Sequence, residues 1–203
     1  MMKEEEKLYT KELYDLSHTA AAPLLEGTTY PWEALPQIGA FIRELGAGLS
    51  LEEYDHPQED VWIHKTANVY PNNFIAGPCV IGAGTEVRPG AFIRGNALVG
   101  ENCVVGNSTE LKNVILFDNV QVPHYNYVGD SILGYKSHMG AGAVTSNVKQ
   151  DKTPVVVHAG FRQLETGLKK FGAMLGDHVE VGCNSVLNPG SVIGRRASVY
   201  PTS

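Results

Sequence analysis

One histidine lies in a setting that suits proton transfer. The segment VPHYNYVGD contains His124, and Tyr127 and Asp130 follow closely. Histidine is the side chain whose charge changes near neutral pH, so it can take a proton from a nucleophile such as an amine. Arg88 and Lys112 are expected to occupy equivalent places, each directly after an inward aliphatic residue of its hexad, and cationic groups of this kind suit an anionic substrate. These residues predict a site where a base and two cations act on a charged small molecule.

A six-residue repeat determines how these side chains are positioned. From Ile63 to Phe117 an apolar residue, almost always aliphatic, recurs at every sixth position. This period fits neither the roughly 3.6-residue turn of a helix nor the alternation of an ordinary strand. It is typical of a parallel β-helix, in which each hexad forms one short strand on a side of a triangular prism. We therefore predict a mainly β chain, a left-handed parallel β-helix of hexapeptide repeats preceded by a short helical N-terminal segment.

The repeat is interrupted twice. Ten residues separate Phe117 from Tyr127, where the rhythm requires twelve, and His124 lies inside this break. No hexad is visible between residues 147 and 173. Stacked repeats accept insertions on one face, which is often the binding face, so we expect residues 147–173 to form a loop that projects from the β-helix. The predicted domains are an N-terminal helical cap at residues 1–60 and a β-helix domain at residues 61–203.

The segment before the repeat is predicted to be helical. Apolar residues recur at helical spacing over residues 32–46, and leucines lie among charges over residues 3–18. Pro31 suits the first turn of a helix, and Pro36 confines or displaces that turn. We expect two short helices that cap the open end of the β-helix core, with a partner-binding helix as the alternative.

Four motifs resemble those of a known family. The segments VRPGAFIRG, GNSTELKN, VPHYNYVGDSILG and HMGAGAVTSN resemble, motif by motif, the acetyltransferase half of the bacterial bifunctional enzyme that makes UDP-N-acetylglucosamine. The resemblance covers about residues 63–203, and H-x-x-Y-x-G-D is its most specific part. The later segment GLKKFGAMLGDHVEVGCNSVLNPGSVIG is similar to the C-terminal β-helix of archaeal sugar-1-phosphate nucleotidyltransferases, which carries the same activity.

The resemblance implies a hexapeptide-repeat acyltransferase that transfers an acetyl group directly from acetyl-CoA to an amino-sugar phosphate such as glucosamine 1-phosphate. It implies a homotrimer, with His124 as general base. The implied substrate-binding residues are Arg88, Lys112, Tyr127, His138, Asn147 and Lys152. The implied coenzyme-binding residues are Ala141 and Gly142, where a bare backbone lets the pantetheine pass, and Lys169 and Lys170, for which solvated charge is the alternative. Asp130 is expected to be a turn and orienting residue.

Two departures from the family leave a second function class open. His138 stands where the bacterial family has Asn, which changes the hydrogen-bonding capacity at a substrate-facing position. Nothing before residue 60 resembles the Gly-rich loop and strand-helix alternation of uridylyl transfer, so we do not expect this chain to make a nucleotide sugar by itself. The alternative to an acetyltransferase is a non-catalytic β-helix that serves the assembly or regulation of a separate nucleotidyltransferase.

Composition and charge limit the kinds of partner that the chain is expected to bind. The net charge of −6 and the isoelectric point near 5.6 give no basic footprint for nucleic acid. No apolar run reaches the roughly 18 residues of a membrane span and the N-terminus has no signal region, so a cytoplasmic protein is expected. Cys79, Cys103 and Cys183 form no CxxC pair and are expected to pack inertly in hexads. No closely spaced pair of histidines predicts a metal site.

Overall fold

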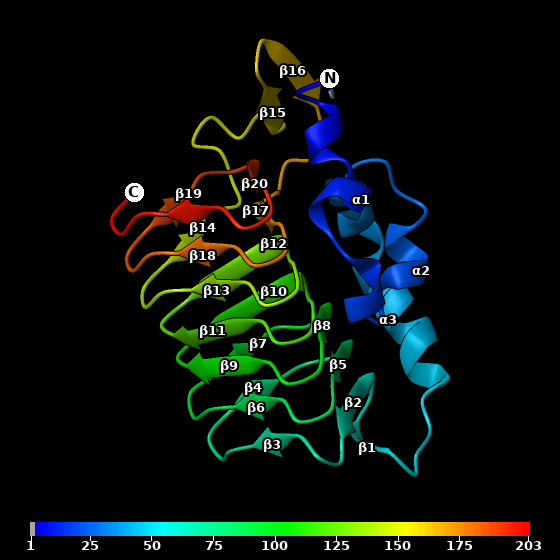
Figure 1. Cartoon of the computed structure of the whole chain (residues 1–203). Helices are drawn as coiled ribbons and strands as arrows, with labels where there is room; N and C mark the ends of the chain where they lie inside the picture. Colours follow the sequence, from blue (N-terminus) through cyan, green and yellow to red (C-terminus); the bar gives the residue numbers. More distant parts are fainter. Residues whose placement is uncertain (1–2) are drawn as a thin grey trace.

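The computed structural model describes residues 3–203 and shows a parallel β-helix with a layer of short helices along one side (Figure 1). Successive coils stack through parallel strand pairs. Val61 lies opposite Cys79, and Cys79 lies opposite Ala97, so each of these coils advances the chain by 18 residues. The predicted parallel β-helix and the helical segment before it are therefore confirmed.

The strands form three faces of the prism, which are here called the covered face, the open face and the third face. The N-terminal helices pack on the covered face. The third face consists of β3 (Asn68–Val69), β6 (Glu86–Val87), β9 (Val104–Asn107), β11 (Gln121–His124), β13 (His138–Met139), β18 (Glu180–Val181) and β21 (Ser198–Val199). The open face consists of β4 (Phe74–Ile75), β7 (Phe92–Ile93), the first parts of β10 (Glu110–Leu116) and β12 (Tyr127–Leu133), β14 (Val144–Thr145) and β19 (Val186–Leu187). The covered face consists of β2 (Val61–His64), β5 (Cys79–Ile81), β8 (Ala97–Val99), the second parts of β10 and β12, β17 (Ala173–Leu175) and β20 (Ser191–Ile193). An antiparallel strand, β1 (Tyr54–Gln58), adds to β2 at the start of the covered face.

Aliphatic side chains of the hexads fill the prism. Val87, Val99 and Val105 are completely buried, whereas the equivalent residues of the first coil, such as Ile75, are partly exposed because no coil precedes them. This burial along one axis confirms the predicted hexad core, which the hydrophobic effect stabilises.

The interruption expected between residues 117 and 127 lies elsewhere. Val99 pairs with Leu116 and Leu116 with Leu133, so each of these two coils takes 17 residues, and Leu111 pairs with Val128. The inward residues are thus Leu116 and Val128, and the assignment of Phe117 and Tyr127 to the register was wrong. One residue is missing at each of two corners, where the chain turns through Asn113 (φ 55°) and Asp130 (φ 49°) in the left-handed region. Because each corner is shortened by a single residue, β10 and β12 run continuously from the open face to the covered face.

The N-terminal helices lie along the covered face rather than at the end of the prism (Figure 1). The helical turns are η1 (Glu6–Leu8), α1 (Thr10–Leu13), η2 (Leu16–His18), α2 (Ala22–Leu25), η3 (Pro31–Gln37) and α3 (Ile38–Ala47), with Pro31 in the first turn of η3 as expected. Contacts join α3 to β5, β8 and β10. The strands beneath point apolar residues outward as well as inward, among them Leu98 and Ile115, which are almost fully buried. The position predicted for the helical cap is therefore corrected, because this apolar surface needs a cover along its length.

The insertion after β14 forms an antiparallel hairpin, β15 (Val156–Ala159) with β16 (Arg162–Glu165). Figure 1 shows this hairpin beyond the last coils, where Arg162 forms an ion pair with Glu5. The stretch does not project as a whole, since Val155 and Phe171 are fully buried and the Phe171 ring lies 5.6 Å from the ring of Trp32. The expected projecting loop of 147–173 is thus limited to the hairpin and the segment that leads into it.

The three cysteines differ in how deeply they are buried. Cys79 and Cys103 are buried, and burial raises the pKa of each thiol to about 12, so neither forms a thiolate at neutral pH. Cys183 is exposed at a corner, which corrects the expectation that it packs inside a hexad. Within residues 3–203 no helix is both long and apolar enough to cross a membrane. Among the same residues no group of three or more His, Cys, Asp and Glu side chains is placed to hold a metal ion.

Candidate functional site

Asp130 organises a polar cluster at the corner between the open and covered faces. Its carboxylate accepts hydrogen bonds from Lys112 Nζ (3.1 and 3.2 Å), Asn113 Nδ2 (3.0 Å) and Asn147 Nδ2 (2.5 Å). Asp130 is 4% exposed, whereas the side chain of Lys112 keeps 26% of its surface accessible. The cluster therefore joins three coils through one buried carboxylate and leaves an ammonium group at the surface.

Tyr127 extends this cluster onto the open face. Its hydroxyl accepts a hydrogen bond from Asn147 Nδ2 at 3.1 Å. A Cβ on Gly129 would lie 2.5 Å from the same hydroxyl, so the missing side chain at position 129 lets the phenol lie over the backbone. Burial, and then the charge of Asp130, raise the pKa of Tyr127, which keeps the phenol protonated and able to donate a hydrogen bond.

His124 lies at the other edge of the open face. It ends β11, is exposed, and its backbone N–H donates to Asn126 Oδ1 at 3.1 Å. Its carbonyl accepts from the N–H of Gly142 at 3.0 Å, so the corner of Ala141 and Gly142 stacks directly on the His124 corner. At Gly142, with φ of 73°, a Cβ would lie 2.2 Å from Asn184 Oδ1, so glycine leaves room for that side chain. The expected base and the expected coenzyme corner are thus neighbours in adjacent coils.

The row of outward side chains on the open face separates these two edges. Phe92 pairs with Glu110, Glu110 with Tyr127, and Tyr127 with Val144 in successive coils. Phe74 and Phe92 are exposed at one end of the row and Val186 at the other. A ligand on this face would therefore contact a largely apolar strip with His124 on one side and the Asp130 cluster on the other.

Arg94, which sequence reasoning did not select, lies one coil before Lys112 in the same position. Ile93 pairs with Leu111, which places Arg94 and Lys112 in register, and Arg94 Nη1 donates to Glu110 Oε1 at 2.7 Å. The hydrogen bond and the charge of Glu110 raise the pKa of Arg94. The separation of 18 residues between Arg94 and Lys112, one full coil, is the signal that could have identified it.

Arg88 does not occupy a position equivalent to that of Lys112. It follows β6 on the third face, and its guanidinium pairs with Glu86 at 3.2 Å. Lys112 follows the part of β10 that belongs to the open face. The expectation that Arg88 and Lys112 occupy equivalent places is therefore wrong, because the two residues lie at different corners of the prism.

Other predicted residues lie outside the Asp130 cluster. His138 is half-buried on the third face, where its Nδ1 lies 2.9 Å from Glu180 Oε2. Lys152, Lys169 and Lys170 are exposed in the insertion. The structure of this single chain does not bring these four side chains to the cluster.

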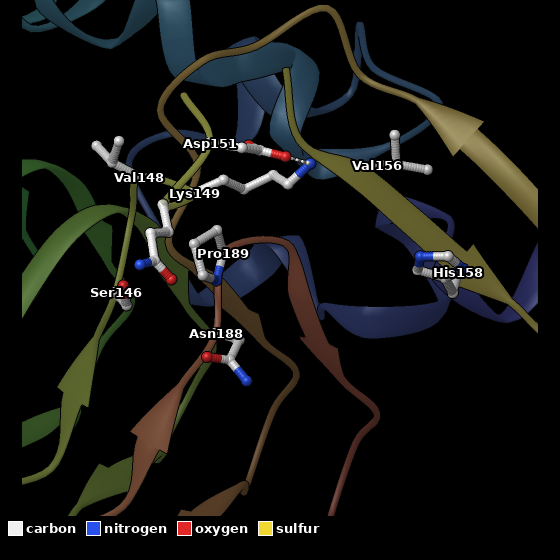
Figure 2. A pocket seen from close by; sticks show the side chains of 9 residues that line it. Ser146, Val148, Lys149, Asp151, Val156, His158, Asn188 and Pro189 are labelled. Atoms are coloured by element: carbon white, nitrogen blue, oxygen red, sulfur yellow. Dashed lines mark ion pairs between the residues drawn. The ribbon is translucent and has the colours of Figure 1, made fainter. Parts of the chain in front are cut away.

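A cavity of about 760 Å³ continues the corner of the Asp130 cluster toward the insertion (Figure 2). Ser146, which follows β14, occupies the position of Gly129 in the next coil and lines the cavity together with Asn188. Figure 2 shows Lys149 paired with Asp151, at 3.3 Å, on one side and His158 of β15 on the other. The cavity is polar where the last coils meet the hairpin, and it lies beside Asn147.

Curated relatives match most of the chain. A "Bifunctional protein GlmU" of Methanococcus maripaludis is 34% identical over 172 residues, which cover 84% of this chain and 42% of the relative. A "Bifunctional sugar-1-phosphate nucleotidylyltransferase/acetyltransferase" of Sulfurisphaera tokodaii is 33% identical over 141 residues, covering 70% of this chain and 35% of the relative. The chain thus spans less than half the length of these relatives, and the resemblance read from the four motifs is confirmed.

A solved structure and a family model agree with this relation. The hexapeptide transferase family protein from Anaplasma phagocytophilum superposes with a TM-score of 0.52 at 17% identity, over 66% of this chain and 70% of that one. The likeness shows the fold and confirms the left-handed parallel β-helix. The family model described as the GMPPB C-terminal domain matches residues 75–200, more than half of the chain. The chain therefore belongs to the GMPPB C-terminal domain family.

Proposed function

We propose that the protein transfers the acetyl group of acetyl-CoA to the amine of an amino-sugar phosphate such as glucosamine 1-phosphate. The proposal rests on the arrangement of the open face, where exposed His124 stands at one edge and the cluster of Lys112, Tyr127 and Asn147 at the other. Similarity to the Sulfurisphaera tokodaii relative, whose name includes sugar-1-phosphate nucleotidylyltransferase and acetyltransferase, supports the substrate class.

In the proposed reaction His124 acts as general base. The amine nitrogen attacks the thioester carbonyl, and the imidazole of His124 takes the proton that the nitrogen loses. The carbon–sulfur bond then breaks, and the departing coenzyme thiolate takes that proton back from the imidazolium. The exposed ring of His124 has no side-chain partner among residues 3–203, so it is free to serve this role.

The Asp130 cluster would bind the sugar phosphate. The charge of Lys112 is shared with Asp130, and that of Arg94 with Glu110, so both cations are held in place near a carboxylate. A phosphate adds charge-assisted hydrogen bonds to such fixed donors. Tyr127 and Asn147 supply the neutral donors, and Asp130 positions the cluster without touching the substrate.

The coenzyme is proposed to pass the corner of Ala141 and Gly142, one coil above His124, where no side chain obstructs the pantetheine. The insertion lysines Lys152, Lys169 and Lys170 are exposed and suit the phosphates of the coenzyme or substrate. In a trimer these lysines, Arg88 and His138 would face a neighbouring copy, which is how residues remote from the cluster within one chain would reach a shared site.

Thiol release from acetyl-CoA tests this function. With glucosamine 1-phosphate, galactosamine 1-phosphate and unphosphorylated glucosamine as acceptors, we expect release that depends on both the amine and the phosphate. Glucose 1-phosphate, which lacks the amine, is the matched control. Release that is equal with and without the amine would contradict N-acetylation.

A second function is supported by the matching family. Its description names a C-terminal domain, and the relatives are more than twice as long as the part that this chain matches. A β-helix of this kind would then serve the assembly or regulation of a nucleotidyltransferase. Absence of thiol release with every amino-sugar phosphate, together with binding to a nucleotidyltransferase, would favour this candidate.

The proposed assembly is a homotrimer. Closed symmetry is the usual state of soluble homo-oligomers, and the exposed Phe74, Phe92 and Val186 of the open face would be covered by a neighbouring copy. Light scattering is expected to give three times the chain mass of 22.0 kDa. A monomer at the concentration used for assays would exclude a site shared between copies.

Arg94 and Arg88 are expected to differ in their effect on substrate binding. Because Arg94 lies in register with Lys112, Arg94→Ala should raise the KM for the amino-sugar phosphate by about tenfold, the effect of losing one charge-assisted contact of roughly 1.5 kcal/mol. Arg88→Ala, the matched control on the third face, should raise it less. Steady-state kinetics measure both, and a larger effect at Arg88 would show that a neighbouring copy, not the Arg94 corner, supplies the cation.

A further inference from the structure

Basic residues take the same turn position in three successive coils at the corner between the covered and third faces. The backbone N–H of Lys136 donates to Asp118 O, that of His178 to Tyr135 O, and that of Arg196 to Asp177 O, at 3.2, 2.8 and 2.9 Å. This repeated hydrogen bond shows that Lys136, His178 and Arg196, here called the basic column, are stacked in register. Neighbouring strands lie about 4.8 Å apart, so the three side chains leave the corner one above another.

The backbone of the basic column favours another residue type. The φ angles of Lys136, His178 and Arg196 are 56°, 59° and 60°. All three lie in the left-handed region, where asparagine and glycine are preferred. In the two preceding coils the same position is occupied by Asn102 (φ 51°) and Asn119 (φ 61°). The turn therefore does not require basic residues at these three positions, since asparagine holds the same conformation in the preceding coils.

The charges of the basic column are not neutralised within the described chain. Among residues 3–203 none of its three side chains forms a salt bridge, and Lys136 and Arg196 are exposed. Lys136 Nζ lies only over the Tyr135 ring, 5.2 Å from its centroid. Lys136 and Arg196, two coils apart with His178 between them, thus place two unpaired positive charges on one corner of a chain whose net charge is −6.

A small pocket of about 150 Å³ lies beside the basic column. Its two carboxylates are already engaged. Asp177 accepts from Arg195 Nη2 at 2.6 Å and from two backbone N–H groups, and Asp15 accepts from Ser17 and lies 3.9 Å from His18 Nε2. The His18 ring stacks on Tyr135 at 3.6 Å, which closes one wall of the pocket. Among residues 3–203, Arg196 is thus the cation of the pocket lining that forms no salt bridge, and Lys136 lies two coils before it in the basic column.

We propose that the basic column and this pocket bind a diphosphate group. A diphosphate carries several negative charges over a short length, so it can accept hydrogen bonds from two or three stacked cations at once. The chemistry is shared by inorganic diphosphate, nucleoside diphosphates and coenzyme A. The column lies at a different corner from the Asp130 cluster and His124, so this binding does not use the residues assigned to the chemistry of acetyl transfer.

The test uses asparagine, the residue that the turn itself favours. The double variant Lys136→Asn/Arg196→Asn should fold with no loss of melting temperature, since Asn102 and Asn119 hold the same conformation. Titration calorimetry at low ionic strength should show binding of inorganic diphosphate to the wild-type chain and at least about tenfold weaker binding to this variant. The control Lys7→Asn/Lys11→Asn removes the same formal charge from the N-terminal segment and should leave the affinity unchanged.

Separate titrations with UDP and coenzyme A identify the source of the diphosphate. The ligand that loses most affinity in Lys136→Asn/Arg196→Asn, but keeps its affinity in Lys112→Met, is the one that the column recognises. No binding of any of the three ligands to the wild-type chain would overturn the proposal. So would equal losses in the column variant and the Lys7→Asn/Lys11→Asn control, because they would reflect net charge alone. These readouts measure binding and do not depend on whether the protein transfers acetyl groups.

Discussion

His124→Ala is expected to lower turnover by about 10²–10⁴-fold while the KM for the amino-sugar phosphate changes little. The imidazole is assigned the removal of the amine proton, and the phosphate contacts at the opposite edge of the open face are left intact. For the same reason the wild-type rate should fall as the medium becomes acidic, because a protonated imidazole cannot accept a proton. Steady-state kinetics of thiol release over a range of pH measure both effects.

His64→Ala is the control for this prediction. His64 lies on β2 and bonds to Thr66, remote from the open face, so its removal should leave turnover and its pH dependence unchanged. Near wild-type turnover in His124→Ala would remove the histidine from the mechanism. His138, beside Glu180 on the third face, would then be the next residue to substitute.

Asp130→Ala is expected to have the largest effect on stability. The change leaves the Lys112 ammonium without its carboxylate and the amides of Asn113 and Asn147 without an acceptor. Removing one partner of a buried ion pair costs about 3–5 kcal/mol, and the lower end applies because Lys112 keeps 26% of its side-chain surface exposed. Urea denaturation should therefore show a loss of about 3 kcal/mol in the free energy of unfolding.

Asp151→Ala provides the comparison, since Asp151 pairs with Lys149 on the surface of the insertion and its removal should change stability little. Asp130→Asn keeps the size of the side chain and isolates the loss of charge. If Asp130→Ala unfolded at the same urea concentration as the wild-type chain, the cluster would not be held together by this carboxylate. The proposed positioning role would then fail as well.

Much of the fold could be read from the six-residue period, because an inward aliphatic residue is the one constant demand of each short strand. The two shortened corners could not be predicted in this way. One residue is missing at Asn113 and another at Asp130, and in the sequence these two losses look like a single break of two residues. Which residues point inward at these corners becomes clear only when each strand is paired with the strand of the neighbouring coil. The register of Tyr127 was misread for this reason.

The position of the helices along one side of the prism could have been predicted from the sequence, but the six-residue period drew attention away from the residues that indicate it. Strands of the covered face read as unbroken apolar triplets, such as Cys79–Ile81 and Val114–Leu116, whereas strands of the other faces carry polar neighbours such as Glu86 and Gln121. A strand that is apolar on both sides is buried on both sides. These triplets predict a covered lateral face, and α3 supplies the cover.

The candidate site was only partly accessible to sequence reasoning. Lys112, Tyr127 and Asn147 do meet at one corner, as their shared role in the resemblance implies. Arg88 was chosen by its motif, but the stacking of coils places Arg94 beside Lys112. A sequence motif identifies the type of residue that is needed. The register of the stacked coils determines which arginine lies at a given corner.

The structure of the protein with coenzyme A and glucosamine 1-phosphate bound would show whether both ligands of the proposed acetyl transfer lie on the open face. We expect the coenzyme thiol beside Ala141 and Gly142, the sugar amine within hydrogen-bond reach of His124 (roughly 2.6–3.2 Å), and the phosphate at Lys112 and Arg94. Both ligands would then lie along the open face. Ligands bound elsewhere, such as in the cavity beside His158 and Asn188, with His124 facing only solvent, would contradict this expectation.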